Sequence, residues 1–105
     1  MADWTKEIKE TVEKNKVAVF MKGTPEEPRC GFSARVVAML EELEVPFKAV
    51  DIFQDHPTLL GQLRDIYGWP TSPQVFVDGE LIGGCDITSE MYESGELQKK
   101  LGIKA

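Results

Sequence analysis

The sequence of 105 residues has only two cysteines, a single histidine and no long apolar segment. Two cysteines are too few for the disulfide framework of a small secreted protein, so we expect a reducing compartment. No apolar run approaches the roughly 20 residues that a membrane-spanning helix requires. The sequence therefore argues against a disulfide-stabilised scaffold, and we expect no membrane partner.

Basic residues are also scarce. Twelve lysines and arginines stand against eighteen aspartates and glutamates, which gives a formal net charge of −6. A nucleic-acid binder needs a basic face to displace counterions from phosphates, so we expect no nucleic-acid partner. Residues 1–7 lack the apolar region of a signal peptide and the arginine-rich composition of a transit peptide. We expect a bacterial cytoplasmic protein, or a mitochondrial or plastid matrix protein if a presequence has been removed.

Helical and extended patterns alternate along the chain. Apolar residues at helical spacing predict four helices, which begin after Asp3, span 31–44 and 57–67, and follow Asp86 with a break near Gly95. Short apolar runs predict four strands, at 16–21, 47–52, 74–77 and 80–82, the last two joined by Asp78 and Gly79. Right-handed crossovers then give one α/β domain over residues 1–105, with a four-stranded mixed sheet flanked by helices on both faces.

Cys30 is the strongest candidate for chemistry. It stands immediately before the predicted helix 31–44, where free backbone amides and the helix dipole stabilise a thiolate. Lys22 and Arg29 are expected to add positive charge and to lower the pKa of the thiol further. The alternative is a buried cysteine that acts as a small hydrophobic residue.

Ser33 occupies the position at which a second cysteine would complete a C-x-x-C motif. A serine hydroxyl cannot attack a mixed disulfide, so the reduction would need a thiol from outside the chain. The other interpretation is that the Cys30 thiolate is a metal ligand.

Residues 83–86 and the bend at residues 69–73 are further candidate site segments. Gly83 and Gly84 suggest that a ligand or another backbone segment approaches closely, and Asp86 is predicted to cap the last helix. Cys85 is as readily a structural thiol as a redox-active one. Pro73 is a candidate cis-proline because it lies in a bend before a strand, and Trp69 is interpreted as a packing residue.

Four segments together resemble the CGFS-type monothiol glutaredoxin family: Lys22–Thr24, Cys30–Ser33, Trp69–Gln74 and Gly83–Asp86. The resemblance covers essentially the whole chain in the same order and spacing. It implies a thioredoxin fold with an extra N-terminal helix and a cis bond at Pro73.

The resemblance also implies a glutathione site beside Cys30. Lys22 would pair with the glycine carboxylate, the backbone of Ser72 would align the tripeptide, and Asp86 with the Cys85 backbone would hold the γ-glutamyl end. Phe32 would lie at the rim. The implied cofactor-binding residues are Lys22, Phe32, Arg64, Thr71, Ser72, Pro73, Gly84, Cys85 and Asp86.

One position departs from the family pattern. Many members place an arginine on the helix before the Trp-Pro-Thr segment, and Leu60 stands at that position here. Arg64, one turn later, is therefore the expected second anchor for the glycine carboxylate.

Three functional hypotheses follow from these residues and the resemblance. In the first, two chains share one [2Fe-2S] cluster held by Cys30 of each chain and by two glutathiones. Such a carrier is monomeric without the cluster and passes the cluster between BolA-like, scaffold and acceptor proteins. In the second, Cys30 catalyses glutathione-dependent thiol–disulfide exchange, so enzymatic activity stays open. In the third, Cys30 and Cys85 form a redox switch.

Overall fold

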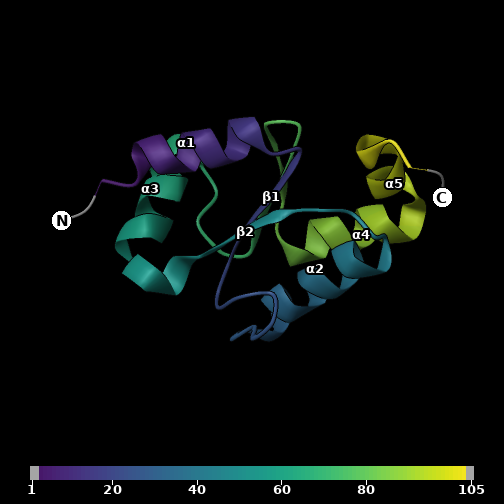
Figure 1. The fold of residues 1–105 in the computed structure, drawn as a ribbon, viewed down its shortest axis with the longest axis horizontal. Coiled ribbons are helices and arrows are strands. Elements are labelled where there is room, and N and C mark those ends of the chain that lie inside the picture. Colours follow the sequence, from purple (N-terminus) through teal and green to yellow (C-terminus); the bar gives the residue numbers. More distant parts are fainter. Residues whose placement is uncertain (1–2, 104–105) are drawn as a thin grey trace.

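The computed structural model describes residues 3–103 and contains one four-stranded mixed sheet (Figure 1). The strands lie in the order β2-β1-β3-β4. β1 pairs in parallel with β2, whereas the β1–β3 and β3–β4 pairs are antiparallel. The strand bounds are Val17–Met21 for β1, Lys48–Asp51 for β2, Gln74–Val77 for β3 and Glu80–Gly83 for β4. The predicted mixed sheet is thus confirmed.

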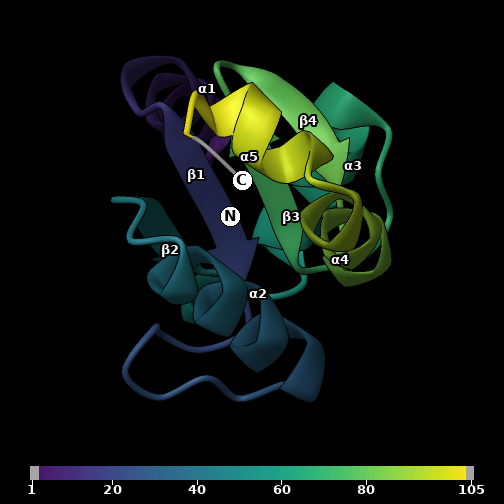
Figure 2. The ribbon, with the colours of Figure 1, turned by 90° about the vertical axis from the view of Figure 1, so that its right-hand side faces the viewer.

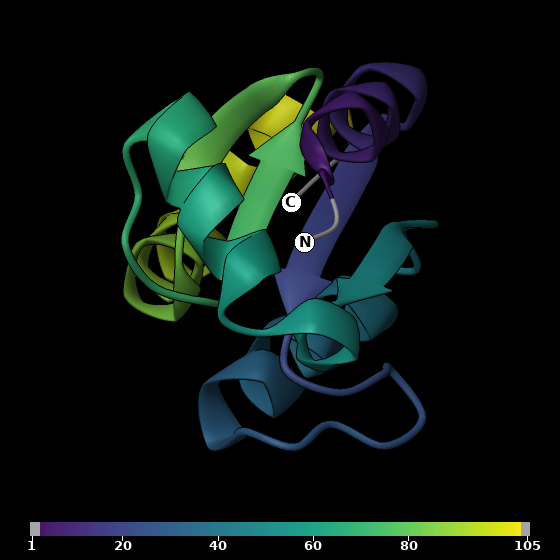
Figure 3. The same cartoon turned by 90° about the vertical axis from the view of Figure 1, so that its left-hand side faces the viewer.

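Helices cover both faces of this sheet. Figure 2 shows α2, α4 and α5 in front of one face, and Figure 3 shows α1 and α3 in front of the other. Their bounds are Thr5–Lys14 for α1, Gly31–Glu42 for α2, Thr58–Tyr67 for α3, Cys85–Ser94 for α4 and Glu96–Leu101 for α5. Within residues 3–103, no helix is long and apolar enough to cross a membrane.

The central strand β1 is buried on both faces, and its side chains divide the core in two. Val17, Val19 and Met21 pack with residues of α2 and α5. Ala18 and Phe20 face the opposite way and pack with residues of α1 and α3. Alternation of side chains along a strand explains why a continuous apolar run was needed here.

Several boundary details differ from the sequence-based expectations. The N-cap of α1 is Trp4, although the Asp3 carboxylate accepts a 3.0 Å hydrogen bond from the Thr5 amide. The predicted cap at Asp86 is wrong: Gly84 is the N-cap of α4, and Asp86 lies within its first turn. A short 3₁₀ helix, η1 at Ile52–Asp55, was not expected.

Other local predictions are confirmed. The Ser72–Pro73 bond is cis, and a second cis bond at His56–Pro57 was not foreseen. Asp78 and Gly79 both have positive φ, at 51° and 81°, as the two-residue hairpin turn between β3 and β4 requires.

The core on the α1–α3 face offers a direct test of this packing. Leu63 is completely buried, whereas Leu60 on the same helix is partly exposed. Leu63→Ala should lower the free energy of unfolding by roughly 2–5 kcal/mol because it leaves a cavity in a close-packed core. Leu60→Ala should cost clearly less in the same urea titration, and equal losses would contradict this assignment of the core.

Candidate functional site

A cavity of about 610 Å³ opens where the turn after β1, the starts of α2 and α4, the helix α3 and the segment before β3 meet. Cys30 and eight of the nine residues expected to bind a cofactor line it: Lys22, Phe32, Thr71, Ser72, Pro73, Gly84, Cys85 and Asp86. Four further lining residues were not predicted for the site: Leu60, Trp69, Pro70 and Ile87. The fold therefore brings together residues that are up to 65 positions apart in the chain, from Lys22 to Ile87.

The bend before β3 is held by a residue that the sequence analysis overlooked. Gln74 is fully buried, and its side-chain amide donates 3.0 Å hydrogen bonds to the carbonyl oxygens of Trp69 and Thr71. With the cis bond at Pro73, these contacts fix the course of the main chain along one wall of the cavity. The signal in the sequence was a polar residue at the start of an otherwise apolar strand.

The close approach suggested by Gly83 and Gly84 is made by the protein itself, by the Ile87 side chain at Gly83 and by Pro73 and Trp69 at Gly84. A Cβ atom added at Gly84 would lie 3.2 Å from the Pro73 carbonyl oxygen and 3.5 Å from the indole nitrogen of Trp69. Glycine therefore lets the start of α4 pack directly against the cis-proline bend. This contact brings Asp86 to the cavity.

Cys30 is the N-cap of α2 and is partly exposed. The backbone amide of Ser33 is the main cause that lowers the pKa of its thiol, and partial burial opposes this effect. The Phe32 amide, the charge of Lys22 and the Ser33 hydroxyl lower the pKa further. Amides at the start of a helix are well suited to stabilise a thiolate. Arg29, which was expected to contribute, instead forms a 3.4 Å ion pair with Glu27.

Ser33 has a structural function of its own. Its side chain is completely buried, and its hydroxyl oxygen accepts a 3.1 Å hydrogen bond from the amide of Lys22. The residue in place of a second active-site cysteine therefore joins the first turn of α2 to the end of β1. The sequence indicated the missing thiol but carried no signal for this contact.

Cys85 differs from Cys30 in its surroundings. It is 7% exposed, and its sulfur lies 4.0 Å from the hydroxyl oxygen of Ser89 on the same helix. Both cysteines are free thiols. Asp86, the next residue, is exposed at the cavity and places a carboxylate beside the start of α4.

Two lining residues carry buried polar atoms that no hydrogen bond within residues 3–103 satisfies. They are the indole nitrogen of Trp69 and the hydroxyl oxygen of Ser72. Unpaired buried polar atoms are uncommon because they lose hydration without compensation. Trp69, interpreted from the sequence as a packing residue, thus belongs to the wall of the site.

Arg64 does not line the cavity, although it was expected to anchor a carboxylate. Its side chain lies 3.9 Å from the Asp65 carboxylate and is 60% exposed. Leu60, at the position where the resemblance implies an arginine, does line the cavity. The cavity therefore presents one cationic side chain, Lys22, among the residues that line it.

Comparison with known proteins gives a consistent result over most of the chain. The family model described as Glutaredoxin matches residues 17–82. Glutaredoxin 4 of Pasteurella multocida (strain Pm70) is 51% identical over 94 residues, which cover 90% of this chain and 85% of the relative. A probable monothiol glutaredoxin 2 of Rickettsia typhi (strain ATCC VR-144 / Wilmington) is 49% identical, with 90% and 84% covered. The solution structure of reduced poplar apo GrxS14 superimposes with a TM-score of 0.79 at 45% identity, covering 92% of this chain and 88% of the other.

The charge of Lys22 provides a test of the thiol environment. Lys22→Gln should raise the pKa of Cys30 because one of the causes that lower it is removed. Alkylation by iodoacetamide should then slow at neutral pH, and the rates of variant and parent should converge at alkaline pH, where both thiols are ionised. Lys14→Gln, which alters a lysine on α1 paired with Glu10, is the matched control. Identical pH profiles for Lys22→Gln and the parent would contradict the electrostatic assignment.

Proposed function

This chain belongs to the glutaredoxin family, and on that premise we propose that it binds glutathione and carries a [2Fe-2S] cluster. The observation that carries the proposal is the position of Cys30. Its thiol, with a lowered pKa, stands at the start of α2 and lines the same cavity as Lys22 and Asp86. We propose this cavity as the glutathione site.

The chemistry of the cavity suits this tripeptide. Glutathione carries carboxylates, one ammonium group, a peptide backbone and a thiol. Lys22 would pair with the glycine carboxylate, and Asp86 would hold the γ-glutamyl end by its ammonium group. The main chain at Ser72, turned by the cis bond to Pro73, would align the peptide in the manner of an added strand.

The cluster proposal comes from the resemblance to monothiol glutaredoxins, and the number of thiols in the chain is compatible with it. Within residues 3–103, no group of three or more cysteine, histidine, aspartate or glutamate side chains could hold a metal ion. A [2Fe-2S] cluster commonly takes four thiolates. Two copies of Cys30 and two glutathiones would supply them, so we propose a homodimer with the cluster and a monomer without it. Phe32, 61% exposed beside Cys30, offers an apolar contact for the second protomer.

Such a site suits transfer of the cluster to other proteins. Each protomer would contribute a single ligand, and the remaining thiolates would belong to small molecules that dissociate. We propose that BolA-like, scaffold and acceptor proteins are the partners in this transfer.

A glutathione-dependent thiol–disulfide oxidoreductase is the second candidate, favoured by the lowered pKa of Cys30. Ser33 supplies no second thiol, so glutathione would have to resolve the mixed disulfide. Steady turnover in a glutathione–disulfide assay, without cluster binding, would support this candidate over the carrier.

A redox switch that forms a disulfide between Cys30 and Cys85 is the third candidate function. Mass spectrometry after mild oxidation tests whether this disulfide forms.

Reconstitution tests the carrier proposal directly. Anaerobic incubation with iron, sulfide and glutathione should give visible charge-transfer absorption and a glutathione-dependent dimer. Cys30→Ser should abolish both because the protein ligand is lost. Cys85→Ser, the matched cysteine control, should retain them because this thiol, on the first residue of α4, is buried and lies 4.0 Å from the Ser89 hydroxyl oxygen. A cluster that persists in Cys30→Ser would contradict the ligand assignment.

The departure at Leu60 provides a test of the glutathione site. Leu60→Arg should tighten glutathione binding roughly fivefold, because a second cation at a partly exposed position adds about 1 kcal/mol of ion pairing. Isothermal titration at low and high salt would measure this gain, which should shrink as salt rises, and Leu60→Gln is the neutral control.

Arg64→Ala should change the affinity for glutathione less than about twofold, since surface pairs outside a site contribute little. Severalfold weaker binding by Arg64→Ala would show that Arg64 reaches the ligand.

A further inference from the structure

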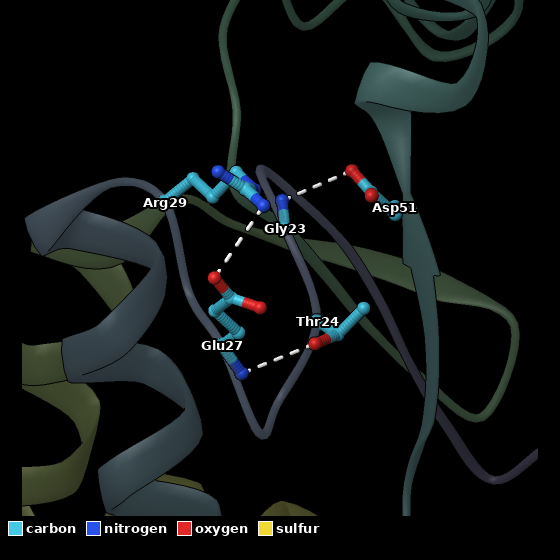
Figure 4. Close-up of polar contacts among 5 residues, drawn as sticks. All are labelled: Gly23, Thr24, Glu27, Arg29 and Asp51. Carbon is cyan, nitrogen blue, oxygen red and sulfur yellow. Dashed lines mark hydrogen bonds and ion pairs between the residues drawn. The ribbon is translucent and has the colours of Figure 1, made fainter.

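The turn that carries Lys22 into the cavity is tied to the sheet by Asp51, a residue of β2 that does not line the cavity. The amide of Gly23 donates a 3.0 Å hydrogen bond to Oδ1 of Asp51 (Figure 4). The same oxygen accepts a 2.9 Å hydrogen bond from the amide of Phe53 at the start of η1. One carboxylate oxygen thus joins two segments that are 28 and 2 residues away from it in the chain.

The Gly23 backbone is closely confined at this point. It is buried with φ at 91°, and an added Cβ would lie 2.5 Å from the Glu27 carbonyl oxygen and 2.7 Å from the Arg29 amide. A positive φ of this size is a conformation that glycine adopts readily and other residues rarely. Gly23 therefore allows the chain to turn tightly enough for its amide to reach Asp51.

The loop from Lys22 to Cys30 is closed on itself. Thr24 and Glu27 exchange backbone hydrogen bonds of 3.2 and 3.1 Å, and the Arg29 amide donates a 2.9 Å bond to the Lys22 carbonyl oxygen. Figure 4 also shows the hydrogen bond that the Glu27 amide donates to the Thr24 hydroxyl and the ion pair between Arg29 and Glu27. These contacts hold the loop together internally, so its placement relative to the sheet depends on the contacts at its base.

Two of those contacts act on consecutive amides. The Lys22 amide is bound by the Ser33 hydroxyl of α2, and the Gly23 amide is bound by the Asp51 carboxylate of β2. Because the two acceptors come from different elements, the peptide between Lys22 and Gly23 is fixed relative to both the helix that begins after Cys30 and the edge strand of the sheet.

We propose that Asp51 is a positioning residue of the site, which fixes the Lys22–Gly23 turn so that the Lys22 ammonium stands near Cys30 and the glutathione carboxylate. This proposal rests on the proposed glutathione site. Without the tether, the turn and the Lys22 side chain sample more positions. Their average interaction with a bound carboxylate is then weaker.

Asp51→Ala and Asp51→Asn form a matched pair that separates hydrogen bonding from charge. Both variants remove the carboxylate charge, but only asparagine keeps an oxygen that accepts from the Gly23 and Phe53 amides. Asp51→Ala should bind glutathione roughly fivefold more weakly than Asp51→Asn, the magnitude of one partly buried hydrogen bond. The pKa of Cys30, measured from thiolate absorption, should be higher in Asp51→Ala than in Asp51→Asn.

Val50→Ala controls for a general loss of stability. Val50 lies beside Asp51 on β2 and packs in the core on the α1–α3 face. Its truncation should lower the melting temperature without changing the pKa of Cys30. Asp51→Ala should raise the pKa of Cys30 even if it lowers the melting temperature no more than Val50→Ala does.

Hydrogen exchange of the Gly23 amide tests the tether without any ligand. Exchange should be slow in the parent and in Asp51→Asn, and at least tenfold faster in Asp51→Ala. If the parent fails to bind glutathione, the proposed function is wrong, and the exchange rates and the pKa of Cys30 still decide the role of Asp51. Equal exchange rates and equal pKa values in the alanine and asparagine variants would overturn the proposal.

Discussion

The lowering of the pKa of the Cys30 thiol by the backbone amide of Ser33 is the interaction on which the rest of the site depends. It exists because α2 begins immediately after Cys30, so the free amides of its first turn face the sulfur. The Ser33 hydroxyl adds a second connection, to the amide of Lys22. One buried serine therefore links the sulfur to the residue whose charge also lowers the pKa of the thiol. Replacing this serine by cysteine would supply a second thiol and weaken the hydrogen bond to Lys22, because sulfur is a poor acceptor.

The charge distribution is compatible with the proposed binding of glutathione by an acidic protein. The formal net charge is −6, which repels an anion at long range, although salt screens this repulsion beyond about 10 Å. Within the cavity, Lys22 stands at the end of β1 and Asp86 at the start of α4. Opposite charges at Lys22 and Asp86 would orient a zwitterionic peptide in the cavity. A ligand with two negative charges and no positive charge would be repelled by the Asp86 carboxylate. Orientation, rather than net attraction, is what this arrangement provides.

The sequence predicted the architecture well and the supporting contacts poorly, for physical reasons. Periodicity and the Asp78–Gly79 turn are local signals, so the helices, the mixed sheet and the helix start at Cys30 followed from them. The roles of Ser33, Gln74 and Asp51 depend on which main-chain groups the tertiary fold brings to them, and no local pattern encodes that. The misplaced cap at Asp86 has the same cause: close packing of Gly84 on Pro73 starts α4 two residues earlier than side-chain preference suggests.

The hydrogen bonds and close packing in the walls of the cavity also bear on the proposed cluster transfer. The wall formed by the cis-proline bend is fixed by Gln74 and by the packing of Gly84, and the loop before Cys30 is closed by its own hydrogen bonds. Walls that are already fixed in this way would need little ordering when the proposed ligand binds, so the entropy cost of binding would be small. The proposed labile elements would be the glutathione thiolates and the contact between protomers at Phe32. In the proposed carrier, a half-site that shares its cluster with a second copy would exchange that copy for another protein while its own Cys30 ligand stays in place.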